Sequence, residues 1–243
     1  MFVSDDSGYA VRDQDLQFLS ISRDAMLAMM GQKVPLGMSA RDFDRFCEEL
    51  RSAVQLDGID DMDVRLQGSA ARFFSGTHKQ MAYLREEIVK DFHEEWKYFP
   101  TPGELGGILA RMTSVWADPA ARPLQRPFDA YCKLGISHAK SDYDVQISSD
   151  ALAKRARAKI DLLGLPDEFD NRHPKYRYIE KDLVHEVAPA LEAWRSRQSD
   201  LLDRSVTIAV FPSRGPERNE DPTQMSSHHQ SSDWVLMTGT GRD

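Results

Sequence analysis

The sequence predicts an α+β fold with a few short strands and many helices. Long stretches carry apolar residues at three- and four-residue steps, which is the spacing of one helix face. Four short stretches have the pattern of strands instead, at residues 62–67, 143–147, 206–211 and 234–237. The chain shows no internal repeat and no heptad pattern, which excludes a solenoid and a coiled coil.

The first part of the chain is expected to be helical. Apolar residues recur at helical spacing from Leu16 to Met30, and Gly31 is a suitable stop. A second helix is expected to begin after Ser39, whose hydroxyl can cap the first turn, and to end near Gly58. Alternating apolar and polar residues then predict the first strand, which runs directly into a Gly-Ser pair.

The middle of the chain returns to helical spacing. Residues 80–98 are dense in large apolar side chains at that spacing. Another helix is expected to begin at Thr101, because Pro102 suits a first turn and Glu104 completes a capping pattern. Residues 117–127 contain three prolines and predict a loop. A short helix is expected at residues 128–134.

The last part of the chain alternates strands and helices. After the second strand, Ser149 is expected to cap a helix over residues 151–163, which Gly164 ends. A further helix is expected over residues 179–198, with a kink at Pro189 because proline lacks the N–H that a helix interior needs. The third and fourth strands follow it.

Composition excludes several classes of protein. Hydrophobic residues make up 41% and charged residues 29% of the chain, which suits a globular core and is too polar for a membrane protein. The net charge of −8 disfavours general nucleic-acid binding, which depends on lysine and arginine. Two cysteines form neither a disulfide framework nor a zinc cluster. No signal peptide and no run of about 20 apolar residues is present, so we expect a cytoplasmic protein with no membrane partner.

Two motifs lie beside expected strands and carry chemistry. Gly68 and Ser69 follow the first strand and open a helix, where backbone N–H groups and the serine hydroxyl can bind a phosphate. Asp142 and Asp144 flank the start of the second strand, and their two-residue spacing places both carboxylates on one side. Two close carboxylates repel unless a divalent cation lies between them, and Mg²⁺ prefers such oxygen ligands. Together these motifs predict a site for metal-assisted nucleotidyl transfer.

The motifs Leu66-Gln67-Gly68-Ser69 and Ser141-Asp142-Tyr143-Asp144-Val145 resemble the signature of the DNA-polymerase-β-like nucleotidyltransferase superfamily, and we place the resemblance nearest its cyclic-nucleotide and oligoadenylate synthase branch. The resemblance covers residues 60–76, 138–165 and 204–238. It implies a small mixed sheet flanked by helices, with an NTP and Mg²⁺ or Mn²⁺ bound across the Gly-Ser turn and the carboxylates. Gly68 and Ser69 would then contact the phosphates together with Arg72, and Asp142 and Asp144 would be the metal ligands.

The chain departs from the family pattern in the spacing of the motifs. More than seventy residues separate Gly68-Ser69 from Asp142, where members of the family usually have about ten to twenty. We therefore expect N-terminal helices over residues 1–58 and a nucleotidyltransferase-like core over 59–243. A large helical insertion at about 77–137 would interrupt this core and would shape the acceptor side of the site.

The third carboxylate of the family is also displaced. The family context aliphatic-Asp-aliphatic-aliphatic-Pro corresponds to residues 208–212, which place Ala209 where the acid is expected. Asp233, at the start of the fourth strand, is the best replacement and is expected as the third catalytic residue with Asp142 and Asp144. The alanine also supports a second reading, in which the fold is kept and catalysis is lost.

Three functional hypotheses follow from the sequence. The first is a metal-dependent nucleotidyltransferase that moves a nucleoside monophosphate from NTP to an acceptor hydroxyl and releases pyrophosphate. Its acceptor can be a nucleic acid, a nucleotide, a small molecule or a protein. The second is a catalytically degenerate binding or regulatory protein, such as a partner in a defence or toxin–antitoxin pair. The third is an α+β protein in which Gly68-Ser69 is a plain turn and the aspartates and Arg72 are ordinary surface residues.

Overall fold

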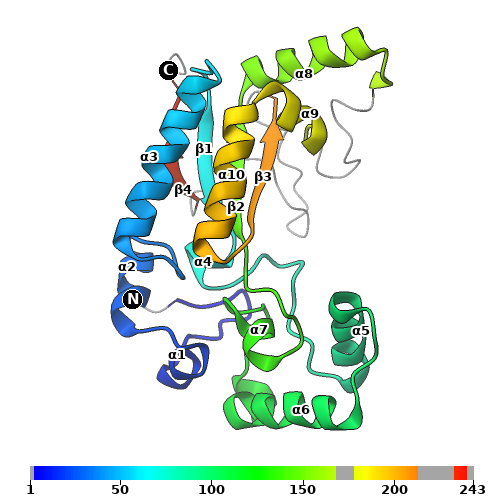
Figure 1. Cartoon of the computed structure of the whole chain (residues 1–243). Coiled ribbons are helices and arrows are strands. Elements are labelled where there is room, and N and C mark those ends of the chain that lie inside the picture. The colour runs from blue at the N-terminus through cyan, green and yellow to red at the C-terminus, as the bar shows by residue number, and fades with distance from the viewer. Residues whose placement is uncertain (1–2, 168–177, 213–232, 240–243) are drawn as a thin grey trace. The chain divides into compact units, whose positions relative to one another are not determined.

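The computed structural model describes residues 3–167, 178–212 and 233–239. The chain separates into two compact units, which are described one at a time. The first unit comprises Met1–Gly37 and Gly68–Ser141, and the second comprises Met38–Gln67 and Asp142–Asp243. Figure 1 labels the elements of both. Compactness alone does not define a functional domain, so the expected boundary at residue 58 and the insertion at 77–137 stay predictions.

The protein is α+β, with ten α-helices and a mixed sheet of four strands in the described residues. The strands are β1 Asp63–Gln67, β2 Tyr143–Ser148, β3 Val206–Phe211 and β4 Trp234–Met237. All four expected strands are therefore confirmed. Their order is β3-β2-β1-β4, in which β1 is antiparallel to β2 and β4, and β2 is parallel to β3.

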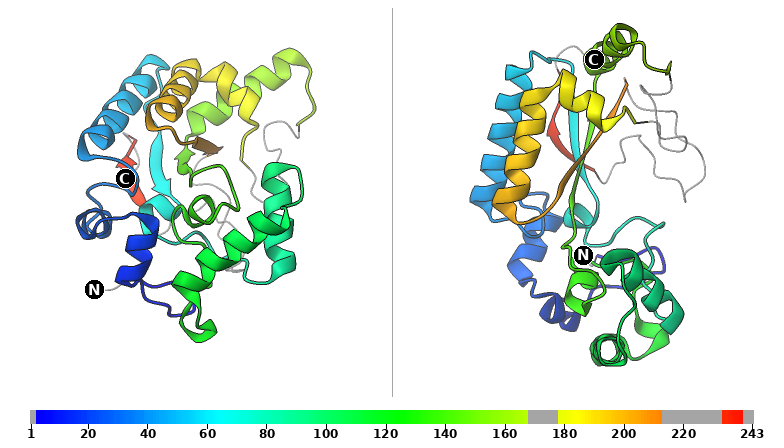
Figure 2. Two further views of the ribbon diagram at one scale, coloured as in Figure 1. Left: turned by 60° about the horizontal axis from the view of Figure 1, so that its bottom comes forward. Right: turned by 45° about the vertical axis from the view of Figure 1, so that its right-hand side comes forward.

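One face of this sheet is apolar and covered by two helices. These are α3 Ala40–Leu56 and α10 Pro189–Leu202, which contact each other and lie side by side on one face of the sheet in Figures 1 and 2. Phe46 of α3 packs against Trp194 of α10 with ring centroids 4.8 Å apart, and it also contacts Tyr143 of β2. The core of the second unit therefore lies between this face and the helix pair.

Two aspartates cap the helices of the second unit. Asp57 accepts hydrogen bonds from the N–H groups of Ala190 and Leu191 at the start of α10. Asp61 accepts bonds from the Ser149 hydroxyl and from two N–H groups at the start of α8 Asp150–Leu163. A carboxylate at a helix N-terminus satisfies otherwise unpaired N–H groups and opposes the positive end of the helix dipole.

The helix expected over residues 179–198 is two helices. They are α9 Lys181–Val187 and α10, which Pro189 begins at its first position. Ala188 between them has φ −140° and ψ 64°, outside the helical region. Proline disfavours a helical conformation in the residue before it, so Pro189 separates two helices where a kink in one was expected.

The first unit is built mainly of helices. They are α1 Asp13–Leu19, α2 Arg23–Met30, α4 Ser69–Arg72, α5 Arg85–Trp96, α6 Pro102–Trp116 and α7 Ala130–Leu134. A short 3₁₀ helix, Pro119–Ala121, lies in the segment expected to be a loop. The capping box of Thr101 and Glu104 is confirmed at the start of α6. The helical run expected from Leu16 to Met30 is divided, because Ser20 takes a left-handed conformation and Ser22 caps a new helix.

None of the helices in the described part of the chain has the length and apolar character needed to cross a bilayer.

Candidate functional site

The second face of the sheet is polar. Residues directly opposite each other on neighbouring strands point to the same side, and side chains alternate along each strand. The strand register therefore gathers one set of side chains on this face. The set is Asp63, Arg65 and Gln67 of β1, Asp144, Gln146 and Ser148 of β2, Thr207, Ala209 and the buried Phe211 of β3, and Val235 of β4. We call it the polar face.

A row of polar side chains crosses this face at one end of the sheet. Asp144 of β2 is paired with Gln67 of β1 and with Thr207 of β3. Leu66 pairs with Trp234, so the next step of the same antiparallel register sets Gln67 opposite Asp233. The resulting order is Asp233–Gln67–Asp144–Thr207, which we call the polar row.

Hydrogen bonds link the polar row at both ends. The Thr207 hydroxyl donates to Oδ1 of Asp144 at 2.8 Å. The Gln67 side-chain amide donates to Oδ2 of Asp233 at 2.9 Å. Both carboxylates are thus held in fixed orientations by neutral donors on neighbouring strands.

Asp142 and Asp144 keep the two-residue spacing that the sequence indicated. Asp142 immediately precedes β2, and both aspartates are partly exposed. Tyr143 between them is fully buried on the apolar face. Strand alternation therefore places the carboxylate of Asp144 on the opposite, polar face, where solutes can reach it.

Asp233 lies in the same row but not beside Asp144. It directly precedes β4 and is only 4% exposed. Gln67 stands between the two aspartates, so their Cα atoms are two strand spacings apart, roughly 10 Å. Asp233 therefore belongs to the polar row as a buried, hydrogen-bonded carboxylate two strands from Asp144.

Strand β3 brings no carboxylate to the polar face. Thr207 is its residue beside Asp144, and Ala209 is its residue beside Gln146. Ala209 therefore lies on the same face as Asp144, two residues after Thr207 along β3. The acid that the resemblance implies at this position is absent from β3.

The Gly68-Ser69 turn belongs to the first unit. Gly68 has φ 80° and ψ −170°, a region that essentially only glycine adopts. Ser69 opens α4 and is 9% exposed, and Arg72 ends it. Because α4 has only four residues, it offers the N–H groups of a single turn and little of the dipole that a longer helix would add.

The backbone just after this turn is also unusual. Phe73 has φ 72° and ψ −44° and is fully buried. A positive φ is rare for a bulky residue, and such conformations persist only where the surrounding structure enforces them. The N–H of Phe73 donates to the carbonyl of Ser69 at 2.8 Å. The segment from Gly68 to Phe73 is therefore a tight, strained turn.

Chain connectivity links this turn to the polar row. Gly68 is the residue after Gln67, and Gln67 pairs with Asp144. Ser141, the last residue of the first unit, is followed by Asp142. The chain thus leaves and re-enters the second unit at the same end of the β1–β2 pair, the end that carries the polar row.

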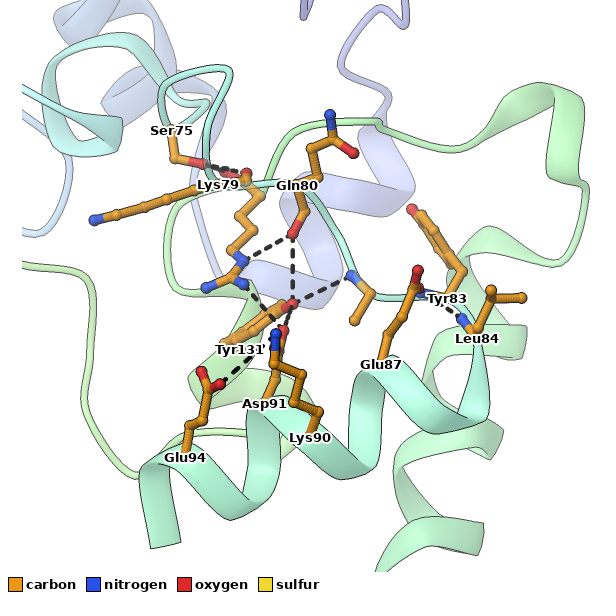
Figure 3. Close-up of polar contacts among 12 residues, drawn as sticks. Ser75, Lys79, Gln80, Tyr83, Leu84, Glu87, Lys90, Asp91, Glu94 and Tyr131 are labelled. Atoms are coloured by element: carbon orange, nitrogen blue, oxygen red, sulfur yellow. Dashed lines mark hydrogen bonds and ion pairs between the residues drawn. The ribbon is translucent and has the colours of Figure 1, made fainter. Parts of the chain in front are cut away.

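A different polar cluster lies inside residues 77–137 and is structural. Asp91 of α5 accepts hydrogen bonds from the hydroxyl of Tyr131 at 2.6 Å and from the guanidinium of Arg126 at 3.0 Å. Figure 3 shows the hydroxyl of Tyr131 directed at Asp91. Arg126 also lies over the Tyr131 ring and donates to the carbonyl of Gln80. Burial and the bond to Asp91 raise the pKa of Tyr131 well above its ordinary value. Since these groups satisfy one another, we assign the cluster to holding this segment together.

The donor set of the polar row suits a hard divalent cation. Its acidic ligands are carboxylates, and Mg²⁺ is commonly bound by one or two carboxylates with water and phosphate oxygens completing the shell. Within residues 3–167, 178–212 and 233–239, no group of three or more histidine, cysteine, aspartate or glutamate side chains is gathered for a metal. Asp144 of the polar row and Asp142, which directly precedes the same strand, carry the two carboxylates that a site of this kind would use.

The sequence singled out Asp142, Asp144 and Asp233 as candidate site residues, but it did not single out Gln67, Thr207 or Arg65, which the register places on the same face or row. Each of these three alternates with an apolar neighbour in its strand. That alternation was a usable signal for a polar face, whereas the strand register was needed to align the residues in rows.

Comparison of the chain with protein-family models, with curated proteins and with solved structures finds no match.

Proposed function

We propose that the protein is a metal-dependent nucleotidyltransferase whose cation site lies at the polar row. The observation that carries the proposal is the position of Asp144. It lies on the polar face at the end of β2, two residues after Asp142, and a neighbouring strand fixes its carboxylate through Thr207. The polar row also occurs where β1 runs into the Gly68-Ser69 turn.

Each residue has a definite role in this proposal. Asp142 and Asp144 would hold Mg²⁺ or Mn²⁺, which neutralises phosphate charge when bound. Gly68 and Ser69 would contact the phosphates through backbone N–H groups and a hydroxyl, and Arg72 would add a cation. Asp233, oriented by Gln67, would accept the proton of the acceptor hydroxyl. That oxygen bonds to the α-phosphorus as the bond to pyrophosphate breaks.

Catalysis of this kind depends on geometry more than on covalent chemistry. In-line attack needs the acceptor oxygen and the leaving group to be fixed, and charge must be neutralised as it develops. The bonds from Thr207 and Gln67 fix two carboxylates before any substrate arrives. This preorganisation supports the assignment of the catalytic site to the polar row.

A catalytically degenerate binding protein is the second candidate. The observation that favours it is the absence of a carboxylate on the polar face of β3, where Thr207 and Ala209 stand. Asp233 is two strands from Asp144 and is already bonded to Gln67. Such a protein would bind NTP with a divalent cation and release no pyrophosphate.

Calorimetry and a turnover assay separate these candidates. The wild type is titrated with ATP and with GTP in the presence of Mg²⁺, beside D142N, D144N and the control D200N, which alters an exposed aspartate of α10. We expect D142N and D144N to lose Mg²⁺-dependent binding and D200N to keep it. Equal binding by all four proteins would contradict both candidates.

Pyrophosphate release is then measured with a panel of acceptors that includes RNA ends, nucleotides and protein. Release that disappears in D142N and D233N supports the enzyme. Tight nucleotide binding without release supports the degenerate protein.

A further inference from the structure

Arg65 lies at the centre of the polar face, and its Nε has no hydrogen-bond partner among the described residues. It lies on β1, opposite Gln146 of β2 and Val235 of β4. Its Nε is buried and makes no hydrogen bond, and among the described residues we find no ion pair or hydrogen bond for its guanidinium. The side chain as a whole is partly exposed.

A buried Nε without a hydrogen bond in this position needs an explanation. Arginine carries five N–H donors and stays charged in proteins. Buried polar groups are normally hydrogen-bonded, because an unmade bond leaves the desolvation cost uncompensated. Arg155 of helix α8 makes such bonds, since it donates to the carbonyl oxygens of Asp57 and Gly58.

The position of Arg65 places it next to the polar row. Gln67 is two residues further along β1 on the same face, so the Cα atom of Arg65 lies about 7 Å from that of Gln67 in the polar row. An arginine side chain is long enough to cross that distance. Arg65 is therefore within reach of a ligand that is bound at Asp144, although it forms no ion pair with that carboxylate.

Among the described residues, Gln146 directly beside Arg65 on β2 is only 3% exposed, but two other side chains around Arg65 leave space for a ligand. Val235, its direct neighbour on β4, is 53% exposed. On the other side of Gln146 stands Ala209, whose side chain is a single methyl group. Neither neighbour covers the guanidinium with a large side chain.

We propose that Arg65 binds a phosphoryl group of a ligand that lies on the polar face. The planar guanidinium matches two oxygens of a phosphate, and such bidentate bonds are among the stronger ones in proteins. The phosphoryl group belongs either to the NTP or to a phosphorylated acceptor. Its assignment to one of these substrates rests on the proposed nucleotidyl transfer, whereas anion binding by Arg65 does not.

The first test measures anion binding without any divalent cation. Inorganic pyrophosphate and ATP are titrated in the presence of EDTA into the wild type, R65Q, R65K and the control R51Q, which alters an exposed arginine of α3. We expect R65Q to bind pyrophosphate at least ~10-fold more weakly, the lower end of what a charge-assisted hydrogen bond contributes. R65K should retain part of the affinity, because lysine keeps the positive charge but cannot form the two parallel hydrogen bonds of a guanidinium. Affinities in R65Q within twofold of the wild type would overturn the proposal.

The second test assigns the phosphoryl group to its source. Inorganic phosphate is titrated into protein that is already saturated with ATP. Continued phosphate binding that R65Q removes assigns the group to the acceptor. Loss of phosphate binding on ATP saturation, together with weaker ATP binding by R65Q, assigns it to the nucleotide. Phosphate binding to the ATP-saturated protein that R65Q leaves unchanged would overturn a role for Arg65.

Thermal unfolding distinguishes a binding residue from a structural one. Removing an unpaired, partly buried charge relieves a desolvation cost. R65Q should therefore unfold at a temperature equal to or above that of the wild type, and pyrophosphate should no longer raise it. A lower unfolding temperature for R65Q without ligand would show that Arg65 supports the fold and would overturn the proposal. If D142N and D144N bind nucleotide with Mg²⁺ as the wild type does while R65Q loses pyrophosphate binding, the proposed function fails and the anion site stands.

Discussion

The two faces of the four-stranded sheet come from the same strands and differ in the polarity of their side chains. On one face Tyr143, Val145 and Ile147 of β2 are at most 1% exposed and face α3 and α10. On the other, Asp144 alternates with them and faces substrates in our proposal. Successive side chains of a strand point to opposite faces of the sheet, so a strand that alternates apolar and polar residues contributes to both faces.

The difference shows where stability and chemistry are placed. Burial of large apolar side chains supplies most of the free energy of folding. The apolar face beneath α3 and α10, which we call the covered face, supplies this free energy here. The polar face can therefore keep groups that would otherwise be unfavourable, such as Asp233 at 4% exposure and the Nε of Arg65, which makes no hydrogen bond among the described residues. We therefore expect changes on the covered face to alter stability and changes on the polar face to alter binding.

The largest loss of stability is expected from W194A in helix α10, which packs on the covered face. Trp194 is fully buried, packs against Phe46 and donates its indole N–H to the Phe46 carbonyl at 3.2 Å. Truncation should lower the free energy of unfolding by about 3–5 kcal/mol, as for other large-to-small core substitutions. Urea denaturation measures it. V235A on the polar face is the matched control and should change stability by less than about 0.5 kcal/mol; similar losses for both would remove the distinction between the faces.

Gly68 directly follows β1, and we expect its substitution to lower the stability of the protein as well. Its φ and ψ lie where an alanine is strained, so G68A should lower the free energy of unfolding by about 1–3 kcal/mol. G106A, within α6, is the control, because an added methyl group would meet nothing within 4 Å. That change should stabilise the protein by roughly 0.5–1 kcal/mol. A neutral G68A would show that this backbone conformation is not required.

We expect substitution of Thr207 to lower metal affinity more than it lowers the stability of the fold. The variant T207V removes the hydroxyl that donates to Asp144 and keeps the shape of the side chain. We expect Mn²⁺ affinity to fall about 5–10-fold, equivalent to about 1–1.4 kcal/mol for one hydrogen bond to a carboxylate. T207S should retain near-normal affinity. Paramagnetic resonance of free Mn²⁺ measures both, and equal affinities for T207V and wild type would remove Thr207 from the site.

The smallest effect is expected at Glu192, on α10 above the covered face. Hydrogen bonds from Arg195 hold the pKa of Glu192 below its ordinary value. A carboxylate whose pKa is lowered by folding adds stability above its unfolded pKa, and this is lost as pH falls through the folded value. E192Q should therefore be less stable than wild type at pH 7 by under ~1 kcal/mol, the upper range for ion pairs near the surface. The difference should disappear as the pH falls through the lowered pKa of Glu192, and a constant difference would contradict the assignment.

Much of the fold followed from local patterns. All four strands lie where alternation indicated them, and Ser39, Ser149 and Thr101 cap helices as expected. These features depend on neighbouring residues alone, so a sequence displays them. The separate helices at Ser20–Ser22 and at Pro189 were missed, because apolar spacing continues across both breaks.

The candidate site was only partly predictable. Asp142 and Asp144 form a local motif, and the sequence suffices to name them. Gln67 and Thr207 become visible only when β1, β2 and β3 are aligned, because register depends on contacts between residues far apart in the chain. The separation of Asp233 from Asp144 by a whole strand has the same origin.

The central claim is that the polar row binds a divalent cation with a nucleotide, and a crystal structure with Mn²⁺ and a non-hydrolysable ATP analogue tests it most directly. Anomalous scattering locates the manganese without ambiguity. The account predicts a peak within about 2.0–2.3 Å of carboxylate oxygens of Asp142 and Asp144, with the phosphates beside it. A nucleotide bound elsewhere, with no manganese at these two aspartates, would contradict it.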